Sequence, residues 1–142
     1  DGSFNNALLE YDRLHECSIA IEILQNISYE YIYTHNQVQE LELKGYAIIQ
    51  GLLNIYQPLL KLSNYEFKKL INGEKVNCLI CKNLLLRLSK KHLVAYKRSV
   101  SELKNNENED VLEWYYRARL IIDYISGMTD DYSLYEYKAL TA

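Results

Sequence analysis

Cysteine and histidine are the first candidates for chemistry in this sequence, because their side chains bind metals at short, regular spacings. Cys78 and Cys81 form a Cys-x-x-Cys pair, but only one further cysteine and three scattered histidines, His15, His35 and His92, are present. A zinc site of this type needs a second ligand pair at a suitable spacing, which the sequence lacks. We therefore expect free, buried thiols at Cys78 and Cys81 and no metal site.

Glu42 is the carboxylate whose position most needs an explanation. It lies four residues after Val38 and three before Gly45, so on a helix it is expected to border the apolar stripe of residues 38–60. A carboxylate beside a core must be paired or must meet a ligand, because burying a lone charge is costly. Two interpretations stay open on these residues alone: a salt bridge to a neighbouring Lys or Arg, or a contact with a ligand.

A basic segment interrupts an otherwise acidic chain. The formal net charge is -3, yet residues 75–101 contain no Asp or Glu. This pattern is typical of an anion-binding or nucleic-acid-binding surface, and equally of a solvated basic helix face. The positive residues of the segment are Lys75, Lys82, Arg87, Lys90, Lys91, Lys97 and Arg98.

Apolar residues recur at three- and four-residue steps along most of the chain, which predicts helices. Pro58 predicts a kink or an end in the second of them. Ser63 and Glu66 have capping-box spacing, so a short helix should begin at residue 64 and stop near Gly73. One or two helices are expected over residues 5–33, and one helix over each of 38–60, 64–73, 79–88, 90–103 and 111–126. A polar loop is expected at 104–110.

The last predicted break lies between residue 126 and a tyrosine-rich run. We expect Gly127 to end a helix in the left-handed conformation and Thr129 to cap the next helix.

The composition predicts one all-α unit over residues 1–142. The chain has one Pro and five Gly, few helix breakers for its length. It contains no uninterrupted apolar run of the ~18 residues that cross a membrane, and nothing at its start resembles a signal peptide. We expect a cytoplasmic protein that does not enter membranes.

The stretch DYISGMTDDYSLYEY, residues 123–137, resembles the carboxy-terminal signature of bacterial deoxyguanosine triphosphate triphosphohydrolases, the dGTPases of the HD-domain superfamily. HNQVQELELKGYAIIQGLLNIYQPLLKLS, RLSKKHLVAYKRSV and EWYYRARLIIDYISGMTD are similar to successive segments of the enterobacterial type, in the same order. GSFNNALLEYDRLHEC, near the start, is similar as well. The resemblance therefore covers essentially the whole chain, and it implies a helical bundle that forms the carboxy-terminal part of such an enzyme.

Enzymes of this family hold a divalent metal through a His, an adjacent His-Asp pair and a later Asp, and this sequence has no His-Asp pair. The resemblance thus implies a longer enzyme whose amino-terminal HD portion is absent here. That enzyme would hydrolyse dGTP to deoxyguanosine and triphosphate with Mg²⁺ or Mn²⁺ bound outside this chain, and it would form homo-oligomers. We expect no catalytic residue in this part, and no activity from it alone.

Guanine recognition is what the resemblance implies for this part. Guanine offers N1–H and N2–H as donors and O6 and N7 as acceptors, so a specific pocket needs a carboxylate, a cation and a ring that stacks. By resemblance, Tyr33 matches the stacking aromatic, Glu42 the guanine-facing carboxylate, and Lys75 a basic residue that is arginine in the family. Lysine supplies a point charge where arginine makes a paired contact.

Five residues near the end are expected to support the architecture rather than to touch substrate. They would form a helix pair that packs against the missing catalytic portion: Arg119, Asp123, Gly127, Thr129 and Asp130.

The basic segment at 75–101 would contact triphosphate or single-stranded DNA, an effector of enzymes of this family. The alternative functions are a non-catalytic helical module that binds single-stranded nucleic acid, and a scaffold for oligomerisation.

Overall fold

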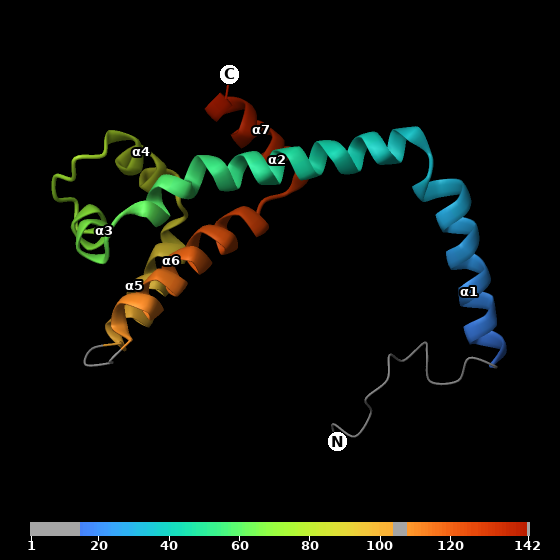
Figure 1. Ribbon diagram of the computed structural model, residues 1–142, viewed down its shortest axis with the longest axis horizontal. Coiled ribbons are helices and arrows are strands. Elements are labelled where there is room, and N and C mark those ends of the chain that lie inside the picture. Colours follow the sequence, from blue (N-terminus) through green and yellow to red (C-terminus); the bar gives the residue numbers. More distant parts are fainter. Residues whose placement is uncertain (1–14, 104–107, 142) are drawn as a thin grey trace. The chain divides into compact units, whose positions relative to one another are not determined.

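The computed structural model describes residues 15–103 and 108–141, and within these ranges it contains helices and no strand, which confirms the all-α prediction (Figure 1). The first part of the predicted helical stretch 5–33 and most of the predicted 104–110 loop lie outside the described residues. The elements are α1 (Glu16–Ser28), the π-helix η1 (Tyr29–Tyr33), α2 (Asn36–Lys61), α3 (Asn64–Ile71), α4 (Leu79–Arg87), α5 (Lys90–Ser101), α6 (Glu109–Ser126) and α7 (Asp130–Thr141).

The contacts divide the chain into two compact units, residues 1–44 and 45–142. Each unit is described by itself below. Helix α2 contributes its first part to one unit and its second part to the other.

In the first unit, histidines begin both helices. The backbone N–H of Cys17 donates to Nδ1 of His15, and that of Gln37 donates to Nδ1 of His35, so each ring satisfies a donor that a helix start leaves unpaired. These two histidines therefore have a local structural role. None of residues 15–44 is buried.

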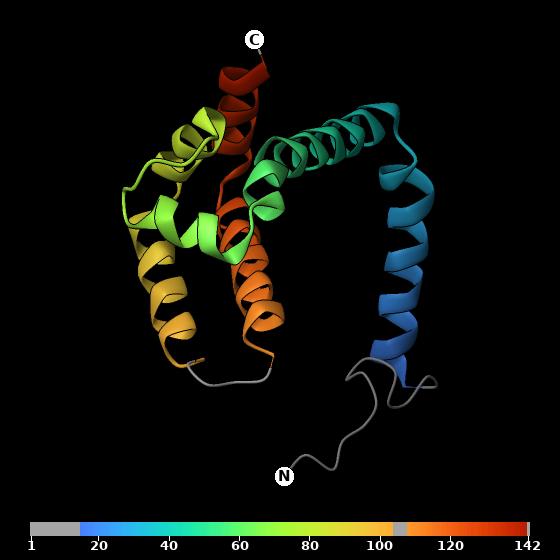
Figure 2. The same cartoon turned by 60° about the vertical axis from the view of Figure 1, so that its left-hand side comes forward.

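The second unit has the core. Helices α5 and α6 lie side by side (Figure 2), and α3 packs against both α4 and α6. The largest apolar side chains at its centre have no exposed surface: Leu52, Tyr56, Leu59 and Phe67.

Helix α2 buries one stripe of side chains, spaced at steps of four, four and three residues, which keeps them on one face of a helix. They are Ile48, Leu52, Tyr56 and Leu59. The sequence predicted a kink or an end at Pro58. The helix continues through it to Lys61, so an end was wrong, and a kink stays a prediction. Core burial of the residues on both sides of Pro58 outweighs the loss of one backbone hydrogen bond.

Helix α3 begins and ends as predicted. The hydroxyl of Ser63 accepts from the backbone N–H of Glu66, and the Glu66 carboxylate accepts from the backbone N–H of Ser63 at 3.0 Å, which completes the capping box. The hydrogen bonds from Ser63 lower the pKa of Glu66. Gly73 follows the helix with a φ of 79°, a conformation that suits glycine.

Of the two predictions for the break between α6 and α7, one is confirmed and one was wrong. The hydroxyl of Thr129 accepts from the backbone N–H of Tyr132 at 3.3 Å, so its predicted capping role is confirmed. Gly127 has a φ of -81° and remains right-handed, so the left-handed prediction was wrong. Its backbone N–H donates to the Asp123 carbonyl at 3.2 Å and ends the helix without a conformation that requires glycine.

The prediction of free thiols at the Cys-x-x-Cys pair was also wrong, because Cys78 and Cys81 form a disulfide. Cys78 caps α4 and Cys81 lies in its first turn, where residues three apart are neighbours; their Cα atoms are 5.3 Å apart. Cys81 is buried, as expected, and Cys17 is free and exposed.

Two buried carboxylates with cationic partners tie the second unit together. The first is Glu113, which pairs with Arg117 one turn later on α6. Arg117 also donates to the Leu59 carbonyl at 3.2 Å and stacks over the Phe67 ring at 4.7 Å. Glu113 accepts from the Tyr96 hydroxyl, and burial together with this bond raises the pKa of that phenol.

The second buried carboxylate is Glu136, which anchors α7. It is fully buried and accepts from Arg87 of α4, with Nε 2.6 Å from Oε1 and a second contact from the guanidinium to Oε2. The hydroxyls of Tyr56 and Tyr124 lie 2.9 and 3.5 Å from the same Oε1. The Arg87 bonds hold the pKa of Glu136 below its usual value, while burial acts in the opposite direction. The tyrosine-rich run after the α6–α7 break therefore fastens the last helix to α2, α4 and α6.

Among the residues that the structure describes, no helix is long and apolar enough to cross a membrane.

Candidate functional site

Tyr33 is the last residue of η1, and it lines a groove of about 580 Å³. The hydroxyl of Thr34 donates to the Glu30 carbonyl at 2.5 Å at the point where the π-helix ends. Tyr33 is more than half exposed, so its ring is available to stack on a ligand.

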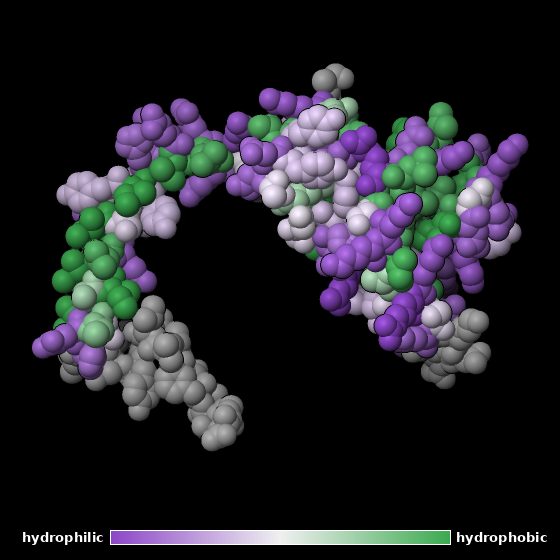
Figure 3. Space-filling view, turned by 180° about the vertical axis from the view of Figure 1, so that it is seen from behind, coloured by the Kyte–Doolittle hydropathy of each residue, from purple (hydrophilic) through white to green (hydrophobic). Residues whose placement is uncertain are grey.

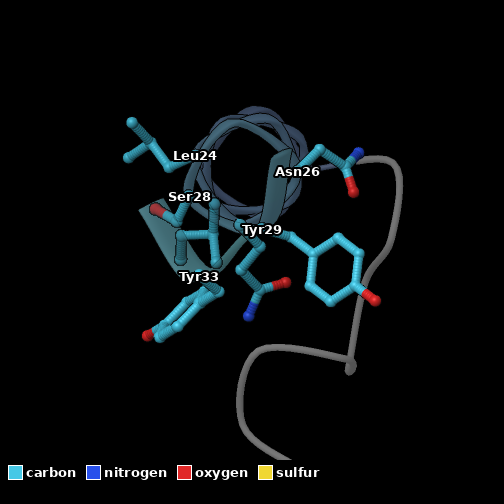
Figure 4. Close-up of a pocket in the computed structure, with 7 residues that line it drawn as sticks. Leu24, Asn26, Ser28, Tyr29 and Tyr33 are labelled. Carbon is cyan, nitrogen blue, oxygen red and sulfur yellow. The ribbon is translucent and has the colours of Figure 1, made fainter. Parts of the chain in front are cut away.

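The groove lies wholly within the first unit and mixes ring, amide and aliphatic side chains. In Figure 4 the rings of Tyr29 and Tyr33 project from the helix on either side of a gap, with Asn26 on the side of Tyr29 and with Leu24 and Ser28 on the side of Tyr33. Ile21 and Gln25 complete the lining. Its volume is in the range typical of small-molecule sites.

Glu42 lies on α2 and is exposed, together with Leu41 and Leu43 beside it. The expectation that it borders a buried stripe was wrong, because residues 36–47 of α2 include no buried side chain, so this part of the helix is exposed. Within the described part of the chain, Glu42 has no ion-pair partner, so the salt-bridge interpretation has no support. Glu42 is not among the residues that line the groove of Tyr33.

Lys75 belongs to the second unit. It is exposed and lines a different, polar groove of about 490 Å³. Lys69, in the same groove, has its ammonium 4.4 Å from the centre of the Tyr65 ring. The three residues predicted to contact guanine are therefore not gathered in one groove of either unit.

The residues predicted to be structural have local contacts. Arg119 and Asp123 form an ion pair at 3.6 Å, one turn apart on α6, with both side chains largely exposed. Asp130 begins α7, and its carbonyl accepts from the Ser133 hydroxyl. Whether these residues also pack against another part of a longer protein stays a prediction.

The basic side chains of the segment at 75–101 are exposed, but two of them are already paired with a carboxylate. Arg87 is committed to the buried Glu136, and Arg98 forms an exposed pair with Glu102 at 3.7 Å. The pattern of charges in the sequence therefore overstates the positive charge that this surface offers to an anion.

The described residues offer no donor set for a metal ion. In the ranges 15–103 and 108–141, no three His, Cys, Asp or Glu side chains gather at a point where they could hold a metal ion. The Mg²⁺ or Mn²⁺ implied by the resemblance does not fit a site among these residues.

An apolar surface covers much of the first unit. Figure 3 shows a band of hydrophobic side chains along α1, and about half of the surface of Ile19, Ile23, Leu24 and Ile27 is exposed. No residue of α1 is buried, and isolated helices of this length are marginal in water.

Comparison with known proteins gives the context for these features. Residues 82–139 match the family described as "Phosphohydrolase-associated domain". A "Deoxyguanosinetriphosphate triphosphohydrolase" of Klebsiella pneumoniae subsp. pneumoniae is 48% identical over 99% of this chain. Proteins of the same name from Enterobacter sp. and Salmonella typhimurium are each 46% identical over the same share. The resemblance to the dGTPases is confirmed.

This chain spans only 28% of the length of each of these dGTPases. The matched family covers the second half of α4 through most of α7, where both buried clusters have residues. Sequence reasoning missed the carboxylates at the centres of these clusters, Glu113 and Glu136. The available signal was their placement among apolar residues, as in VLEWYYRA for Glu113, with Arg117 four residues later.

Proposed function

We propose that the full-length protein to which this chain belongs is a dGTP triphosphohydrolase, and that this chain supplies guanine recognition and structural support. The observation that carries the proposal is the 48% identity over 99% of the chain to a protein named for that activity. Metal-dependent hydrolysis, with Mg²⁺ or Mn²⁺ as the ion, would belong to the rest of the polypeptide, which is where the HD portion is expected.

In this proposal guanine meets a ring, a carboxylate and a cation. Tyr33 stacks on the base, Glu42 accepts from N1–H and N2–H, and Lys75 donates to O6 and N7. The exposure of Tyr33 and the absence of an ion-pair partner for Glu42 among the described residues support these roles. A carboxylate held for ligand is more useful unpaired, since a local salt bridge would have to be broken first.

Hydrolysis of dGTP by the full-length protein tests the proposed activity. Triphosphate release is measured with Mg²⁺ or Mn²⁺ for the full-length product of the gene and for this 142-residue chain. We expect activity from the full-length protein and none from this chain. Inactivity of both would favour a scaffold or a nucleic-acid-binding module, and salt-dependent binding of single-stranded DNA would then be measured.

Substitution of Glu42 tests the recognition site. In the full-length protein, Glu42→Ala should lower kcat/KM for dGTP at least about a hundredfold, because guanine donors would be left unpaired. Glu40→Ala, a matched change at an exposed carboxylate two residues away, should leave kcat/KM nearly unchanged. If Glu42→Ala also melts at a clearly lower temperature than the wild type, its loss of activity would reflect unfolding, and Glu42 would have a structural role instead.

Lys75 is tested by the charge-preserving change Lys75→Arg. Arginine can pair with O6 and N7 together, so the preference for dGTP over dATP should be kept or increased. A variant that loses this preference would show that Lys75 does not contact the base.

A further inference from the structure

We propose that Cys78 and Cys81 are a reversible redox pair that exchanges with small thiols such as glutathione. In this pair Cys78 is the sulfur that reacts with the external thiol, and Cys81 is the sulfur that opens and closes the disulfide from inside the protein. The inference uses contacts of the second unit alone and does not depend on the proposed function.

The start of α4 holds the two cysteines close enough to bond. Cys78 caps the helix and Cys81 lies in its first turn, with their Cα atoms 5.3 Å apart, a separation within the range that a disulfide needs. Because the helix itself sets this spacing, the sulfurs remain neighbours when the bond is open. Closure within the chain is therefore favoured over reaction with a second external thiol.

The two sulfurs differ in their access to solvent. Cys81 is 1% exposed and belongs to the core, whereas Cys78 is only partly buried. Leu79 and Ile80, which lie between them, are 76% and 64% exposed, so the start of α4 faces solvent on that side. An external thiol can therefore reach Cys78 but not Cys81.

The surroundings of the pair also suit its reduced form. The backbone N–H of Cys81 donates to Sγ of Cys78 at 3.2 Å, and the positive end of the helix favours a thiolate there. Sγ of Cys81 lies 3.8 Å from the Pro58 carbonyl oxygen, to which a thiol in this position can donate. Reduction thus leaves a stabilised thiolate at Cys78 and a hydrogen-bonded thiol at Cys81.

Opening of the disulfide consumes two molecules of glutathione. The thiolate of the first attacks Sγ of Cys78, the bond to Cys81 breaks, and the Cys81 sulfur leaves with the electron pair and takes up a proton. The thiolate of the second attacks the glutathione sulfur of this mixed disulfide, and Cys78 leaves as a thiolate. Two glutathione thiols are oxidised to one glutathione disulfide while the protein disulfide is reduced to two thiols, and the reverse sequence closes the pair.

The test uses the full-length protein, from which trypsin releases both cysteines on one peptide, residues 76–82. The native protein is equilibrated with mixtures of reduced and oxidised glutathione, quenched with acid, alkylated and digested. Mass spectrometry should show this peptide passing from dithiol to disulfide and back as the mixture changes. Cys17→Ser, at a free and exposed cysteine, is the matched control and should leave these fractions unchanged. A peptide that stays in one form from fully reduced to fully oxidised glutathione overturns the proposal.

The roles of the two sulfurs are tested by brief alkylation of the reduced wild-type protein, which needs no variant to fold. Iodoacetamide should label Cys78 on the order of tenfold faster than Cys81 in the native protein, and the two rates should be nearly equal in urea. Equal rates in the native protein overturn the assignment.

A variant tests the closing step. Cys81→Ser should retain glutathione on Cys78 as a stable mixed disulfide, because the sulfur that would displace it is missing. A folded Cys81→Ser protein that retains none overturns the role of Cys78 as the sulfur that external thiols reach.

Discussion

Glu136→Gln should destabilise the second unit by about 2–3 kcal/mol. The substitution keeps the size of the side chain and removes its charge. The amide NH₂ takes the place of Oε2 and faces the Nη2 donor of Arg87, so that bond is lost. The remaining oxygen, in the place of Oε1, can still accept from Arg87 Nε and Tyr56, but without the charge of the carboxylate. Removal of one partner of a buried pair costs about 3–5 kcal/mol, and we take less because the Arg87 side chain is 36% exposed and can regain water.

Trp114 provides the assay. It is the only tryptophan of the chain and lies on α6, where its Nε1–H donates to the Leu60 carbonyl at 3.3 Å, so its fluorescence reports on the second unit. Urea titrations of the 142-residue chain at pH 7 give the free energy of unfolding for wild type and variant. Glu102→Gln makes the same change at an exposed pair and should shift that free energy by less than about 0.5 kcal/mol.

The pH dependence tests the electrostatic origin of the effect. Because the folded-state pKa of Glu136 is lowered, its contribution is fully present above the unfolded-state pKa of about 4.3 and is lost as the pH falls through the folded-state pKa. The difference between wild type and Glu136→Gln should therefore be constant from about pH 6 to 8 and shrink in acid. A difference that persists undiminished in acid, or one as small as that of Glu102→Gln, would refute this reasoning.

Two further stability predictions use the same titration. Gly51→Ala should destabilise the second unit by about 1–3 kcal/mol, because the new Cβ would overlap the Tyr137 ring of α7. Gly45→Ala, on the same helix, places a Cβ that meets nothing within 4 Å and should raise the free energy of unfolding by up to about 1 kcal/mol. Equal effects at the two glycines would contradict the close contact between Gly51 and Tyr137. Ser63→Ala should cost about 1 kcal/mol through loss of the α3 cap, and an unchanged midpoint would rule that cap out.

Local rules account for the elements that the sequence predicted well. The apolar periodicity of α2, the capping box at Ser63 and the cap at Thr129 depend on residues within one or two turns of each other. The local rules failed where contacts with residues far along the chain decided the structure. Pro58 did not end α2, because the core on both sides of it outweighs the bond that it removes.

The candidate site was only partly accessible to sequence reasoning. Tyr33 came from a resemblance. Periodicity singled out Glu42 but misjudged its exposure, because no residue from 36 to 47 of α2 is buried. The groove around Tyr33 was not foreseen, because it depends on a π-helix whose five residues have no sequence pattern of their own.

The sequence by itself determined the all-α class, most helix ends and the similarity to dGTPases, because each depends on short-range periodicity, capping or residue identity. Only the tertiary structure decided that Glu136 lies buried between Tyr56, Arg87 and Tyr124, which are up to 80 residues away along the chain. The local sequence around a buried glutamate can be similar to that around an exposed one. The difference lies in whether distant segments bring a cation and hydroxyls to the carboxylate, and no local sequence pattern predicts those contacts.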